Sequence, residues 1–114
     1  MEFAVRARDI VWNEDLQERV KRSIKFAVDR HKSRIDRISV YLADLNGPRG
    51  GVDKLCQITA DLRGAEPVRI LETGVDVIAV VNRAVRRLGY RIGRCVHRRR
   101  IAGSPEHRAT IRGT

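Results

Sequence analysis

The sequence predicts an α+β domain of order β-α-β-β-β-α, a four-stranded sheet with two helices packed on one face. Four short segments alternate apolar and polar residues, which is typical of strands with one buried face. Two longer segments repeat apolar residues at intervals of three and four, which is typical of amphipathic helices. Turns rich in Gly, Pro and Asn separate these segments. The 114 residues are enough for one hydrophobic core without metals or disulfides.

The first third of the chain predicts a β-α-β unit. Phe3 and Val5 lie in a short alternating segment, which predicts the first strand. Asn13 is a favourable N-cap followed by two acidic residues, so a helix is expected from there to about Lys32. A second strand is expected at residues 38–42. It should lie parallel to the first, because a helical connection makes a right-handed crossover between parallel strands.

Two more strands follow a loop at residues 46–51 that contains three glycines and a proline. The third strand is expected at residues 56–62, with Cys56 on its buried face. The fourth is expected to start near Val68 and to be broken by residues 73–74, Thr-Gly. The short turns after the second and third strands favour antiparallel pairing.

A long helix is expected to begin at Val75 or Asp76. Its apolar positions recur in steps of three and four: Ile78, Val81, Val85, Leu88, Ile92 and Cys95. Gly89 and Gly93 each destabilise a helix by up to about 1 kcal/mol relative to Ala. Two interpretations stay open. Either the glycines let an RNA backbone or a neighbouring helix approach closely, or the helix frays after Leu88.

The chain is expected to be one soluble cytoplasmic domain. Residues 1–102 should form the domain, and residues 103–114, which lack periodicity, a disordered tail. No apolar run approaches the roughly 18 residues of a membrane span, and the N-terminus has no apolar signal segment. Cys56 and Cys95 are the only cysteines, and their wide separation favours unpaired thiols in a reducing compartment.

The charge balance predicts a polyanionic partner. The chain has 24 Lys and Arg residues against 14 Asp and Glu, a net charge of +10. Twenty of the 24 cations are Arg, whose planar fork binds phosphate in two places and stacks on bases. A membrane surface is the competing polyanion, but membrane-bound basic helices carry apolar aromatic faces, and aromatic residues are only 4% of this chain. Nucleic acid is therefore the predicted partner.

The last predicted helix holds most of this charge. Between Val77 and Pro105 there are eight arginines and no acid, which is +8 of the net +10. Five of them form a stripe in steps of four and three: Arg83, Arg87, Arg91, Arg94 and Arg98. Like charges at this spacing repel, so the stripe indicates an external anion, although charged runs can also be solvated faces. The first helix is basic but also contains acids, and the basic edges of the two helices are expected to form one groove matched to an RNA backbone.

Residues for catalysis or metal binding are not recognisable. The three histidines have no metal-ligand spacing with each other or with the cysteines, and no Gly-rich phosphate loop joins a strand to a helix. Cys56 lies in the apolar register of its strand and is expected in the core. We therefore expect a protein that binds and does not catalyse, with no cofactor, no metal and no small-molecule substrate.

Two runs carry a resemblance to a known family. Residues 40–56 read VYLADLNGPRGGVDKLC and residues 77–88 read VIAVVNRAVRRL. Both resemble the ribosome hibernation-promoting factor and ribosome-associated translation inhibitor family, in its short form, over about residues 2–100. The resemblance implies the same β-α-β-β-β-α fold, which is similar to that of double-stranded RNA-binding domains. It further implies a stress-response factor that binds rRNA of the small ribosomal subunit in the channel for mRNA and tRNA, and that is monomeric off the ribosome.

The RNA contacts that this resemblance and the arginine stripe imply are eight side chains: Arg22, Lys25, Arg83, Arg86, Arg87, Arg91, Arg94 and Arg98. Three alternatives stay open beside ribosome binding. The first is a general structured-RNA-binding protein that acts away from the ribosome. The second is an enzyme with Cys56 as nucleophile. The third is a regulatory module whose arginines bind an acidic protein.

Overall fold

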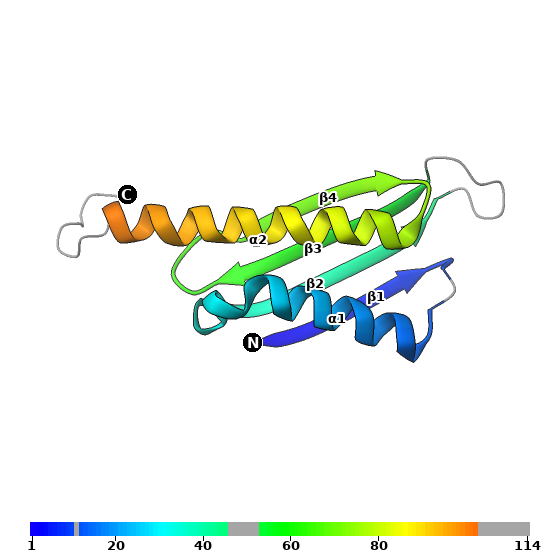
Figure 1. Cartoon of the computed structure of the whole chain (residues 1–114), viewed down its shortest axis with the longest axis horizontal. Coiled ribbons are helices and arrows are strands. Elements are labelled where there is room, and N and C mark those ends of the chain that lie inside the picture. The colour runs from blue at the N-terminus through cyan, green and yellow to red at the C-terminus, as the bar shows by residue number, and fades with distance from the viewer. Residues whose placement is uncertain (11, 46–52, 103–114) are drawn as a thin grey trace.

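Four strands form one mixed sheet in the order β1-β2-β3-β4 (Figure 1). They are β1 (Glu2–Arg8), β2 (Ile35–Asp44), β3 (Lys54–Leu62) and β4 (Val68–Gly74). The computed structural model describes residues 1–10, 12–45 and 53–102, with side chains to residue 97. β1 and β2 are parallel, and the other two pairs are antiparallel, as the sequence predicts.

The register aligns apolar residues into rows on one face of the sheet. Val5 pairs with Val40, Val40 with Ile58, and Ile58 with Ile70. Val40, Ile58 and Ile70 are buried, and Val5 is half-buried. Each strand therefore turns its apolar side chains to the same face of the sheet, and other elements must bury that face.

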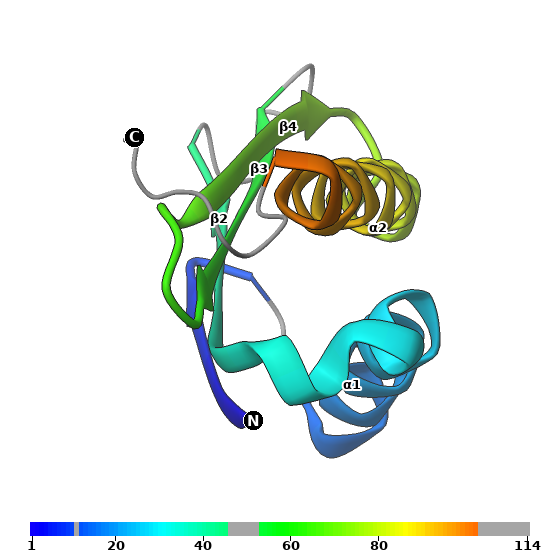
Figure 2. The same cartoon turned by 90° about the vertical axis from the view of Figure 1, so that its left-hand side faces the viewer.

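Both helices cover that face, as Figure 2 shows. They are α1 (Glu14–Val28), continued by a short 3-10 helix η1 (Asp29–Arg34), and α2 (Val77–Ala102). Ile24 of α1 and Leu88 of α2 are fully buried, and α2 packs against β3, β4 and α1. The predicted fold class, a four-stranded sheet with two helices on one face, is confirmed.

Cys56 is fully buried in β3, so the prediction that it belongs to the core is also confirmed. Burial raises the pKa of its thiol to about 12. The thiolate is the reactive form of cysteine, so the pKa and burial of Cys56 disfavour a nucleophilic role.

The N-terminus of α1 is capped as predicted, and its C-terminus is not where the periodicity places it. The Asn13 side chain accepts a hydrogen bond of 2.8 Å from the backbone N–H of Leu16. The α-helix ends at Val28, and the prediction that it continues to about Lys32 is wrong for its last turn. The chain tightens there into η1, which carries no buried residue and turns the backbone into β2.

The connection between β4 and α2 also differs from the expectation. β4 continues through Gly74 and does not break at residues 73–74, because Thr73 and Gly74 still pair with β3. Gly74 serves a close approach to α2. A Cβ there would lie 2.7 Å from both Arg83 Nη2 and Val80 Cγ2. Asp76 caps α2 by accepting a 3.0 Å hydrogen bond from the backbone N–H of Ala79.

Two predictions lie outside the described residues, the loop at 46–51 and the tail at 103–114. At the base of the first of these segments, Asp53 is buried and accepts a 2.7 Å hydrogen bond from Lys54 Nζ. Lys54 Nζ also lies 3.4 Å from Asp44. These contacts join the end of β2 to the start of β3.

Candidate nucleic-acid interface

Arg83 and Arg87 do not project freely from α2, because Glu72 of β4 lies between them. Arg87 Nη1 lies 2.5 Å from Glu72 Oε2, and Arg83 Nε lies 3.3 Å from Oε1. The same guanidinium groups donate to the backbone carbonyls of Leu71 and Thr73, at 3.1 and 2.7 Å. The two arginines thus occupy carbonyls of the edge strand β4, which protects this edge from pairing with another strand.

This contact corrects the interpretation of the arginine stripe. The α2 sequence contains no acid, but an acid from β4 neutralises part of the stripe in the folded chain. The hydrogen bond from Arg87, followed by that from Arg83, lowers the pKa of Glu72. Its folded pKa is depressed, so the contribution of Glu72 to stability is present at neutral pH and is lost as the pH falls.

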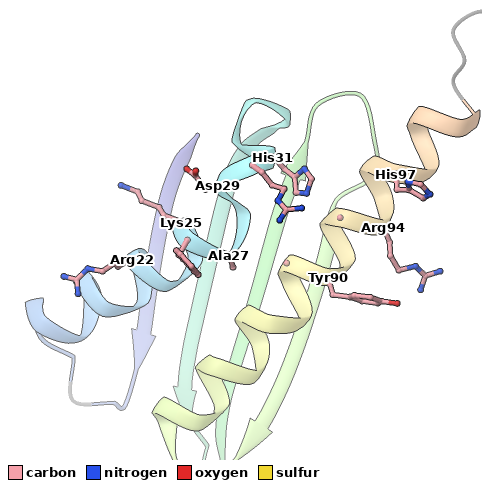
Figure 3. A pocket seen from close by; sticks show the side chains of 12 residues that line it. Arg22, Lys25, Ala27, Asp29, His31, Tyr90, Arg94 and His97 are labelled. Carbon is pink, nitrogen blue, oxygen red and sulfur yellow. The ribbon is translucent and has the colours of Figure 1, made fainter.

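Three other predicted residues of α2 are exposed: Arg86, Arg91 and Arg94. None of them forms an ion pair with a described residue. Arg94 lies over the ring of Tyr90, 5.8 Å from its centroid, and both side chains point away from α1 (Figure 3). The side chain of Arg98 is outside the described part of the chain. The exposed surface of α2 therefore keeps unneutralised arginines beyond the two that hold β4.

The predicted residues of α1 lie on the opposite flank of the helical layer. Arg22 and Lys25 point away from α2 in Figure 3. The ammonium group of Lys25 lies 5.8 Å from the centroid of Phe3 in β1, and that of Lys21 lies 6.0 Å from it. Arg22 and Lys25 nevertheless line one groove together with Arg94 of α2, so the expected groove between the basic edges of the two helices is present for these three cations. The other predicted cations of α2 with described side chains lie outside its lining: Arg83, Arg86, Arg87 and Arg91.

This groove has a volume of about 980 Å³ and lies between the two helices. Gly89 lies where the two helices pack closely, since a Cβ there would lie 3.3 Å from the carbonyl oxygen of Ala27. At Gly93 the nearest atom to such a Cβ is His31 Nε2, at 3.9 Å. The helix continues through both glycines, so the fraying interpretation is wrong. Gly89 allows close helix packing, and Gly93 borders open space.

Other side chains that line the groove are Phe26, Arg30, His31 and His97. They were not predicted as site residues. Arg30 and His31 lie in η1, outside the regular helical period, so a helical wheel does not place them correctly. Phe26 has a signal in the sequence, because a large apolar residue falls outside the apolar stripe of its helix.

Replacing Gly93 by Ala is expected to raise the free energy of unfolding by about 0.5–1 kcal/mol. The Ala side chain favours the helix, and its Cβ would make only ordinary contact with His31. The same change at Gly89 should gain less, because its Cβ would press on the Ala27 carbonyl. Urea unfolding followed by circular dichroism measures both. A loss of stability in Gly93→Ala would contradict the open space described here.

Among residues 1–10, 12–45 and 53–102, no group of three or more His, Cys, Asp or Glu residues is placed to hold a metal ion. No helix in the same ranges is long and apolar enough to cross a membrane.

Comparison with known proteins identifies the fold. No protein-family model matches the chain, and no curated protein matches its sequence. Among solved structures, the N-terminal domain of Protein Y from Thermus thermophilus matches with a TM-score of 0.68 at 21% identity, covering 83% of this chain and 99% of that one. A ribosomal subunit interface protein from Coxiella burnetii matches with a TM-score of 0.70 at 12% identity, covering 85% and 99%. The chain is similar to both over nearly their whole length.

Proposed function

We propose that this chain is a ribosome-associated hibernation factor that inhibits translation by binding the small ribosomal subunit. In this proposal the helical layer binds rRNA and the protein body occludes the mRNA and tRNA channel under stress. The observation that carries the proposal is the set of exposed cations on that layer, of which Arg22, Arg86 and Arg91 have no ion pair with a described residue.

The fold supports the same proposal. Both matching structures have it, and one of them is described as a ribosomal subunit interface protein. The runs at residues 40–56 and 77–88 add the family resemblance of the sequence itself. In this proposal the protein works in the cytoplasm, is monomeric off the ribosome and uses no small-molecule substrate.

The physical mechanism is occlusion driven by electrostatic attraction. Arginines that neutralise phosphates release the counterions condensed on the RNA, and this release provides much of the binding free energy. The same long-range field speeds association with the rRNA. No bond is made or broken in this mechanism, so a folded, correctly charged surface is sufficient for inhibition.

Binding to small ribosomal subunits is expected to weaken steeply with salt. If roughly six phosphates are neutralised, a plot of log K against log salt concentration should have a slope of about −4 to −5. Co-sedimentation of the purified protein with small subunits over a series of KCl concentrations measures the slope. A slope near zero would contradict the electrostatic mechanism.

A perfect RNA duplex is the matched competitor in this experiment. A ribosomal factor should bind small subunits far more tightly than the duplex at equal salt. Equal affinity for both would favour a general structured-RNA-binding protein that acts away from the ribosome. Fractionation of a stationary-phase lysate on a sucrose gradient then shows whether the endogenous protein travels with the ribosomes.

A further inference from the structure

Phe26 is the most exposed large apolar side chain of the described residues, with 88% of its surface open to solvent. It precedes Ala27, the residue that touches Gly89 of α2, and it lines the groove between the helices. A single exposed apolar residue needs no special explanation. Phe26 differs because it lines the same groove as the basic residues Arg30 and Arg94.

The groove offers positive charge next to this ring. Arg30 and Arg94 are exposed residues of its lining, as is His97. The acid in the lining is Asp29, and its carboxylate already lies 3.8 Å from the Lys32 ammonium. The lining therefore favours an anionic group, and arginine is well suited to phosphate.

The groove also has enough space for a small organic group. Gly89 closes it where the helices touch, and Gly93, one turn further along, has no atom closer than 3.9 Å to the position of a Cβ. The volume of about 980 Å³ is within the range of pockets that bind small organic groups. Proteins hold unstacked nucleotides in grooves that combine an aromatic side chain for stacking with cationic side chains for the phosphate, and this groove has both and free space beside them.

We propose that this groove holds one unpaired nucleotide of the RNA target, with its base stacked on Phe26 and its phosphate bound by Arg30. This inference rests on the proposed function, because it names the feature of the RNA that the helical layer selects. A perfect A-form duplex keeps its bases stacked and paired, and only a bulge, loop or end presents a free base. The protein then binds structured RNA with an unpaired position in preference to a plain duplex.

The test uses two RNA hairpins that differ in a single bulged 2-aminopurine, whose fluorescence is quenched on stacking. The wild-type protein is expected to bind the bulged hairpin about 10-fold more tightly than the perfect one and to quench the 2-aminopurine. Phe26→Leu keeps an apolar side chain but removes the ring. It is expected to lose both the preference and the quenching, with duplex affinity and the salt slope unchanged.

Two further variants make the result specific. Gly93→Leu places a side chain in the open part of the groove and is expected to abolish the preference as well, in a protein whose thermal unfolding shows that it is folded. Tyr41→Leu is the matched control, since Tyr41 lies on the uncovered face of the sheet, with Arg6 5.3 Å from its ring centroid. It should leave the preference and the quenching unchanged.

Three outcomes would overturn the inference. These are equal wild-type affinity for the two hairpins, quenching that persists in Phe26→Leu, and loss of quenching in Tyr41→Leu alone. A polyglutamate peptide that bound in a Phe26-dependent way, while the bulged hairpin did not, would identify the groove as a protein site and would also overturn it. Failure of the proposed function looks different, because neither hairpin nor the small subunit would then bind in a salt-dependent manner.

Discussion

A double charge reversal, Arg86→Glu with Arg91→Glu, is expected to weaken binding to the small ribosomal subunit by about 100-fold at physiological salt. Each arginine is exposed and has no ion pair with a described residue, so each is available to phosphate. A hydrogen bond to a charged group contributes roughly 1.5 kcal/mol or more, and two such bonds correspond to about two orders of magnitude in affinity.

Co-sedimentation with small subunits measures this effect, and the salt slope should become less negative by about 2 at the same time. The matched control is Arg37→Glu with Arg69→Glu, which makes the same change in net charge on the strands of the sheet. Arg37 and Arg69 are exposed, and Arg37 lies only at the 4.0 Å limit of an ion pair with Glu2. Equal losses in the two double variants would mean that net charge alone governs binding, and the helical layer would not be the interface.

The choice of Arg86 and Arg91 follows from the contacts of their neighbours. Reversal of Arg83 and Arg87 would place two new carboxylates beside Glu72 and would free the β4 carbonyls that the guanidinium groups now bind. Such a variant would lose stability as well as charge. A loss of RNA binding in it could not be assigned to either cause.

The fold was largely predictable because its local patterns agree with its packing. Alternation located all four strands, and the steps of three and four identified both helices. Cys56 was placed in the core from its register alone, and the structure buries it completely. These features depend on which face of each element is apolar, and the spacing of apolar residues along the sequence indicates that face directly.

The candidate site was less predictable because it depends on contacts between elements. Glu72 of β4 neutralises Arg83 and Arg87 of α2, and the spacing of residues within the helix does not reveal this contact. The flank of α2 that faces α1 depends on strand order, so the spacing alone does not show which arginines of the stripe line the shared groove: Arg94 does, and Arg83 and Arg87 bind β4. Gly89 shows the same limit, since helix propensity permits fraying and only the contact with Ala27 excludes it.

Leu88→Ala is expected to lower the free energy of unfolding by about 3 kcal/mol and the Tm by roughly 12 °C or more. Leu88 is fully buried in the core between α2, α1 and the sheet, so its truncation removes apolar contacts and leaves a cavity. Thermal and urea unfolding measure the loss. Leu71→Ala is the control, because this side chain is 55% exposed and its removal should change stability by no more than about 0.5 kcal/mol.

The same variant separates folding from binding. The exposed arginines are not part of the core that Leu88 fills, so at a temperature where Leu88→Ala is still folded its salt slope for small subunits should equal that of the wild type. A stability change below about 1 kcal/mol would contradict the packing of α2 on the sheet. A changed slope in the folded variant would show that the arginines depend on the exact seating of α2. Binding would then depend on the shape that packing gives the helical layer as well as on its charge.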